Sequence, residues 1–298
     1  MKRIAYTFIA LSLLLSSCGN DDADPASQGA DWTPSFSRSL GQEVRIVGRK
    51  DGETQFSHIL IPSVDGGAAS WKDNAKPASD KVAASNEFIA FMPADDVLPK
   101  QVEHDGTTEY LVDYHDEKPR SFTMYPLMAQ MKVHIWVELS EADSKEHTLT
   151  NDSIYLYTKA DVDYPNKSLK NPSARKRVYW GTVAQTDETD DDGRYFRKLS
   201  METPLVVIPQ TFAADEEILW FSIGKAHYYF KLDAPVELKP GYLASFTLHV
   251  TYEEEEEEGG EAPAPPTQNV IPVDKHTITI TPWEMGETYN EQVTTPDK

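Results

Sequence analysis

The sequence predicts an all-β protein built from antiparallel strands. From Met131 to Leu139 the odd-numbered residues are apolar and the even-numbered ones are polar or aromatic, which is the period of two of a strand with one buried face. Leu243–Tyr252 shows the same alternation. Turn-forming pairs such as Asp105-Gly106 and Asp192-Gly193 separate short β-rich runs, and no helix longer than two turns is predicted. Many short strands between turns are typical of β-sandwiches.

The N-terminus has the pattern of an export signal. Two basic residues precede the apolar stretch Ile4–Leu15, which is shorter than the roughly 20 residues of a transmembrane helix. Two serines then lead to Cys18, the only cysteine of the chain. The order Leu-Ser-Ser-Cys resembles the lipobox of bacterial lipoproteins. This resemblance implies that residues 1–17 are a removed signal peptide and that Cys18 carries a diacylglyceryl group with acyl chains such as palmitate. A buried core cysteine is the disfavoured alternative, because Cys18 precedes every predicted strand.

Residues 18–30 are predicted to be an acidic tether. Asp21, Asp22 and Asp24 resemble the short tag that sends lipoproteins of certain anaerobes to the outer face of the outer membrane. A plain solvated tether is the alternative interpretation. The expected location is the outer surface of the outer membrane, reached through the lipid on Cys18.

The composition limits the partners and the means of stabilisation. A formal net charge of −21 disfavours nucleic acid and anionic lipid surfaces, since both would repel the chain. No cysteine follows Cys18, so stability must come from buried apolar area and not from disulfides. The length allows two domains. We predict sandwiches at residues 31–119 and 120–285, divided at the charged segment His115–Arg120, and a polar tail at 286–298.

A second shift in composition lies near the C-terminus. Residues 253–266 contain six consecutive glutamates followed by a Gly- and Pro-rich run, and this acidic, Pro-rich segment is predicted to be an exposed loop of the second domain. Beyond it, Thr277–Thr281 is predicted to be one more strand. That strand either closes its own domain or reaches another molecule.

No catalytic, metal or cofactor site is predicted, and the chain is expected not to be an enzyme. Thr186–Gly193 resembles a calcium loop at its start, but Leu199 stands where a bidentate carboxylate is needed, so a solvated hairpin tip is predicted instead. The eight histidines lack zinc-binding spacing, and there is no nucleophile elbow. Carboxylates are too numerous for the sequence to exclude a glycosidase pair. Trp71, Trp136 and Trp180 could form a sugar-stacking platform, although packing in the core or an interface is favoured.

Several segments together resemble the fimbrillin family of surface lipoproteins that become pilus subunits. In chain order they are Phe88–Pro93, Met124–Val133, Val206–Thr211, Pro240–Val250 and Ile280–Trp283. The resemblance implies two tandem β-sandwiches of transthyretin-like, Greek-key type. It also implies assembly by strand exchange: a protease cuts after an arginine, an N-terminal strand is lost, and a strand of a neighbouring subunit fills the groove. The physical basis is β-augmentation.

The N-terminal parts for this exchange can be assigned to the sequence. Trp32 and Phe36 lie on the apolar side of an alternating segment that would be the removable strand, and Arg38 follows as the candidate cleavage site. Arg45 is a poorer candidate, because it lies within a strand that should remain. The alternative is that residues 31–39 are a tether with an incidental arginine.

The C-terminal candidate for a donor or closing strand contains Ile278, Ile280 and Trp283. The resemblance implies other fimbrillin subunits and outer-membrane lipid as partners, with a fimbrial building block as the function. The alternative is a monomeric surface adhesin that binds a glycan or a host protein. A polar tail follows the last strand, so the position as stalk, tip or anchor subunit stays open.

Overall fold

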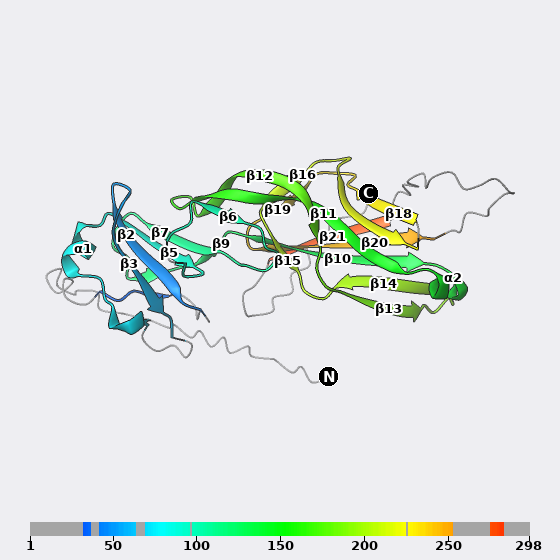
Figure 1. The fold of residues 1–298 in the computed structure, drawn as a ribbon, viewed down its shortest axis with the longest axis horizontal. Helices are drawn as coiled ribbons and strands as arrows, with labels where there is room; N and C mark the ends of the chain where they lie inside the picture. Colours follow the sequence, from blue (N-terminus) through cyan, green and yellow to red (C-terminus); the bar gives the residue numbers. More distant parts are fainter. Residues whose placement is uncertain are drawn as a thin grey trace, which may run out of the picture. The chain divides into compact units, whose positions relative to one another are not determined.

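The computed structural model describes residues 32–36, 42–63, 69–95, 97–224, 226–252 and 275–282, and it confirms the all-β class (Figure 1). In these residues the α-helices are α1 (Ser79–Ala84) and α2 (Glu141–Glu146), and Lys72–Asn74 forms a 3₁₀ turn. No helix among them is long and apolar enough to cross a membrane. The division into two tandem domains at residues 119 and 120 stays a prediction.

Six antiparallel strands form a sheet in the N-terminal part of the chain. Their spatial order is β4 (Ser70–Trp71), β3 (Glu53–Ile61), β2 (Val44–Lys50), β5 (Glu87–Met92), β7 (Leu111–His115) and β9 (Tyr125–Pro126). Gly48 in β2 is required by packing, because a Cβ atom there would lie 2.1 Å from the ring of Phe56 on the neighbouring strand. Two further short strands, β1 (Ser35–Phe36) and β8 (Ser121–Phe122), pair with each other.

The C-terminal part contains two larger sheets. The first has the order β13 (Val183–Thr189), β14 (Tyr195–Met201), β10 (Ala129–Glu138), β20 (Tyr242–Thr251) and β21 (Lys275–Pro282), and β15 (Leu205–Val207) also pairs with β10. The second has the order β12 (Ser168–Tyr179), β11 (Leu149–Asp163), β17 (Glu217–Ile223) and β18 (Ala226–Lys231), and β6 (Gln101–Glu103) also pairs with β11. β16 (Gln210–Phe212) and β19 (Val236–Leu238) form a separate pair.

The two C-terminal sheets share one hydrophobic core. Apolar residues of β10, β14 and β20 and those of β11, β17 and β18 belong to a single buried cluster, which is the arrangement of a two-layer sandwich. Along β10, burial alternates residue by residue as the sequence predicts. Two pairings of the described chain differ from the expected antiparallel pattern: β1 and β8 run parallel over two residue pairs, and β10 and β20 run parallel over nine. A parallel pair needs a long crossover, and the chain between Glu138 and Tyr242 supplies it.

A second buried cluster contains residues of both parts of the chain. Val47 and Phe91 of the N-terminal sheet belong to it together with Ala160 and Val162 of β11. Polar contacts add to this connection: the buried carboxylate of Asp113 lies 2.6 Å from Lys167 Nζ, in the turn between β11 and β12. The two parts therefore share apolar and ionic contacts.

Candidate functional site

The last described strand, β21, lies at the edge of its sheet and pairs antiparallel with β20 along its whole length. Ile278 is opposite Phe246 and Ile280 is opposite Ala244, and both isoleucines pack against the large core while keeping some exposure. The ring of His276 lies on the same face, 4.9 Å from the ring of Phe230. In this structure the strand therefore closes the sandwich of its own chain.

The N-terminal strand β1 is much shorter and runs parallel to β8. The Ser35 N–H donates to the carbonyl of Arg120 at 3.0 Å, and the rings of Phe36 and Phe122 lie 6.2 Å apart. Thr33 adds one side-chain contact, because its hydroxyl accepts a hydrogen bond from Trp71 Nε1 at 3.2 Å. Trp32 is partly buried. The segment that the sequence nominates as a removable strand is thus paired over two residues.

Three of the predicted site residues lie outside the described residues. They are the lipidation residue Cys18, the cleavage candidate Arg38 and Trp283 of the C-terminal strand. Arg45, the poorer cleavage candidate, is buried within β2, and its guanidinium donates to the Ser57 hydroxyl.

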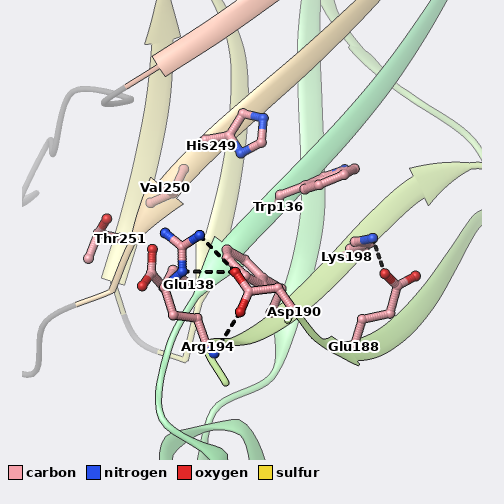
Figure 2. Close-up of a pocket in the computed structure, with 10 residues that line it drawn as sticks. Trp136, Glu138, Glu188, Asp190, Arg194, Lys198, His249, Val250 and Thr251 are labelled. Carbon is pink, nitrogen blue, oxygen red and sulfur yellow. Dashed lines mark hydrogen bonds and ion pairs between the residues drawn. The ribbon is translucent and has the colours of Figure 1, made fainter. Parts of the chain in front are cut away.

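A pocket of about 600 Å³ lies on the outward face of the first C-terminal sheet, and the sequence did not predict it (Figure 2). We call it the sheet-end pocket, because it lies where β10, β13 and β20 end and β14 begins. Four strands and the turn between β13 and β14 supply its lining: Trp136, Glu138, Glu188, Asp190, Arg194, Phe196, Lys198, His249, Val250 and Thr251.

Strand register brings these side chains together. Trp136 of β10 is paired with Lys198 on one side and His249 on the other, so the three form one row across the sheet. The Lys198 ammonium lies 3.9 Å from the centroid of the Trp136 ring, and the His249 ring lies 5.0 Å from it. Glu138, which is paired with Phe196 and Thr251, begins the next row. Lys198 therefore covers part of one face of the Trp136 ring, and the pocket combines the remaining aromatic surface with hydrogen-bonding groups.

Both cations of the sheet-end pocket are paired with carboxylates inside it. Lys198 contacts Glu188 across the β13–β14 pair. Arg194 contacts Asp190 through Nε at 2.8 Å and through Nη2 at 2.7 Å. Partial burial opposes ionisation of Asp190, but the backbone N–H and the guanidinium of Arg194 outweigh this effect and lower the pKa of the carboxyl. The Asp190 carboxylate is therefore ionised at neutral pH.

The remaining candidates from the sequence have other positions. Trp71 and Trp180 are buried, which confirms the packing interpretation for both, whereas Trp136 faces outward in the sheet-end pocket. The predicted hairpin tip, Thr186–Gly193, is shorter in the structure, because residues 186–189 belong to β13 and Asp190–Gly193 forms the tip, with Gly193 at φ +82°. No group of three acidic, histidine or cysteine side chains among the described residues could hold a metal ion. The sequence signal for the pocket was an aromatic residue at an outward position of an alternating strand.

A second, more open pocket of about 500 Å³ lies on the outward face of the other sheet. Trp220 and Tyr155 line it with three consecutive acidic residues, 215–217. Arg177 lies over the ring of Trp220, with 4.2 Å between its Cζ atom and the ring centroid. Arg177 therefore covers one face of the aromatic ring that this pocket would offer.

No curated protein matches the chain. The chain is similar to solved structures from Bacteroides species. A proposed cell adhesion protein of Bacteroides uniformis is 13% identical with a TM-score of 0.44, over 84% of this chain and 94% of that one. Another from Bacteroides ovatus is 12% identical with a TM-score of 0.44, over 87% and 91%.

A fimbrial protein of Bacteroides ovatus is 9% identical with a TM-score of 0.31, over 74% of this chain and 47% of that one. A sequence profile described as fimbrillin-like matches residues 112–283. This match spans more than half of the chain.

Proposed function

The chain belongs to the fimbrillin-like family, and from this membership we propose that it is a structural subunit of a cell-surface fimbria. In this proposal the chain is exported as a lipoprotein through Cys18, and removal of an N-terminal strand by cleavage after Arg38 starts assembly by strand exchange. Other subunits of the same family are the partners. The proposal does not assign a stalk, tip or anchor position.

The observation that carries the proposal is the weak attachment of β1. Two residues pair with β8, and a two-residue ladder provides few backbone hydrogen bonds, each contributing about 1 kcal/mol net. Yet this segment contacts deeply buried residues. Phe36 lies beside Phe122, which is fully buried, and Thr33 accepts a hydrogen bond from Trp71, which is nearly so. Losing the segment would uncover an apolar site together with the unpaired backbone of Ser121 and Phe122. Such a site suits an extended apolar segment from another subunit.

β21 is the candidate for that segment in a neighbouring subunit. Ile278 and Ile280 alternate with threonines, so the strand presents one apolar face. β20 is its partner in the present structure, and donation would require that pairing to open. In the uncut chain, a short tether keeps β1 at a high effective concentration near its site beside β8, so β1 would compete with any donor strand. Cleavage should therefore precede assembly.

Cleavage and assembly can be tested together on the protein with Cys18 replaced by Ala, which should be free of membranes. Incubation with an arginine-specific protease should produce an N-terminus at Ser39 and then heat-resistant oligomers. Arg38→Ala should block both. Arg120→Ala is the matched control, since it removes an exposed arginine next to β8, and it should be cut and should assemble normally.

Oligomers formed by Arg38→Ala at the wild-type rate would rule out this activation step. The lipid anchor is tested separately by cell fractionation. Wild-type protein should remain with the outer membrane and Cys18→Ala should not, and an unchanged mass and location for Cys18→Ala would contradict lipidation.

A further inference from the structure

We propose that the sheet-end pocket binds a neutral saccharide. This role goes beyond that of a fimbrial subunit and requires neither cleavage nor strand exchange. The volume of the sheet-end pocket, about 600 Å³, lies in the range of about 300–1,000 Å³ that is usual for small-molecule sites.

The aromatic residues are concentrated at this end of the sheet. Along the rest of the outward face, β10 carries Gln130, Lys132 and His134, and β13 and β20 carry the apolar Ala184 and Leu243. The other outward residues of β13, β14, β20 and β21 are small and polar: Thr186, Ser200, Ser245, Thr247, Thr279 and Thr281. Trp136 and Phe196 instead stand in adjacent rows on neighbouring strands. Large aromatic side chains on a solvent-facing sheet surface mark a contact site more often than small hydroxyl residues do.

Two polar groups of the pocket, Arg194 and Glu138, have hydrogen-bonding capacity to spare. A guanidinium donates five hydrogen bonds, and only Nε and Nη2 of Arg194 contact carboxylates of described residues. The Asp190 carboxylate already accepts from two backbone N–H groups and from these two nitrogens, so its capacity of about four is used. The Glu138 carboxylate has no hydrogen bond or ion pair with any described residue. Donors and acceptors therefore alternate around an aromatic surface, and a pyranose offers the complementary pattern of C–H faces with a rim of hydroxyl groups.

The charges favour a neutral ligand over an ionic one. An anion would have to displace Glu188 from Lys198 or Asp190 from Arg194, and it would meet the Glu138 carboxylate. The net charge of −21 adds a repulsive field. A cation would meet Lys198 and Arg194 in the same small space. A neutral polyol can use both ion pairs without breaking either.

The experiment uses an array of neutral oligosaccharides, with gluco-, galacto-, manno- and N-acetylglucosamine oligomers, and the sialylated counterparts of the galactose-terminated members. Uncleaved protein with Cys18→Ala should bind at least one neutral glycan, and sialylation of that glycan should weaken binding. Titration calorimetry with the best neutral binder should then show at least about a tenfold loss of affinity for Trp136→Ala and for Glu138→Gln.

Two control variants and one conservative test variant make this result specific. Trp220→Ala removes an outward tryptophan from the other sheet and should leave the affinity unchanged. Glu138→Gln keeps the size of its side chain, so it tests the pocket even if Trp136→Ala misfolds. Arg38→Ala should bind normally, which separates this proposal from the assembly mechanism.

Either of two results would overturn the proposal. One is the absence of binding to every neutral glycan on the array. The other is binding that Glu138→Gln and folded Trp136→Ala leave unchanged.

Discussion

β1 and β21 are the first and last strands of the described chain, and very different amounts of structure hold them in place. β1 pairs over two residues with β8, and Phe36 contacts one aromatic ring across that pair. β21 pairs over eight residues with β20, and its isoleucines pack against the largest core of the molecule. Both ends of the described chain therefore supply edge strands, but only β1 can leave with a small loss of stability. That asymmetry is what an activation step at the N-terminus requires.

Deleting each strand should give the largest contrast. A chain that ends at residue 274 loses β21, exposes one side of β20 and should lose most of its stability, which for a domain is about 5–15 kcal/mol. A chain that starts at Ser39 loses β1 and should keep cooperative unfolding, with a loss of about 2 kcal/mol. Urea denaturation at low protein concentration measures both. Equal losses for the two chains would contradict the conclusion that β21 contributes more to stability than β1 does.

Single substitutions in β21 should show which face contributes to stability. Ile280→Ala removes a partly buried side chain from the core, and we expect a loss of about 1–2 kcal/mol, below the range for fully buried residues. Thr279→Ala changes the outward face of the same strand and should change the free energy of unfolding by less than about 0.5 kcal/mol. If Thr279→Ala were the more damaging of the two, the register of β21 with β20 would be wrong.

Substitution in β1 should act locally and weakly. Phe36→Ala removes the ring that contacts Phe122, and an aromatic pair contributes about 0.5–1.5 kcal/mol beyond the area that it buries. We expect little change in global unfolding but faster proteolysis of the N-terminal segment, measured as the rate of appearance of the Ser39 N-terminus. Ser35→Ala, which keeps the backbone hydrogen bond to Arg120, is the matched control and should be cut at the wild-type rate.

Acid should have the smallest effect and should act outside both terminal strands. Burial lowers the pKa of His104 below its ordinary value of 6.5, and its Nε2 atom has no hydrogen-bond partner among the described residues. As the pH falls, the His104 imidazole is therefore protonated in the unfolded chain before it is protonated in the folded one. The free energy of unfolding thus keeps its full value above pH 6.5 and decreases as the pH falls below 6.5. His104→Gln should flatten the decrease in urea midpoint between pH 7.5 and 5.5, and Phe36→Ala should not. Equal slopes for His104→Gln and wild type would exclude His104 as a source of acid sensitivity.

The sequence by itself determined the strands and their faces. The alternation from Met131 to Leu139 predicted which side chains of β10 are buried, because a pleated strand turns successive residues to opposite sides whatever its neighbours are. Asp192-Gly193 predicted the hairpin tip, since glycine adopts a positive φ without steric cost. The fimbrillin resemblance was confirmed at the family level by the match over residues 112–283.

Which strands become neighbours could be learned only from the tertiary structure. The pairing of β10 between β14 and β20 places Trp136 beside Lys198 and His249, although the three are far apart in the chain. Periodicity reports the face of a strand but carries no information on its partner or register, so the sheet-end pocket could not be predicted from it. The same reason applies to the tryptophans: Trp180 and Trp136 both occur in β-rich segments, and the packing of the two sheets buries one and leaves the other facing outward.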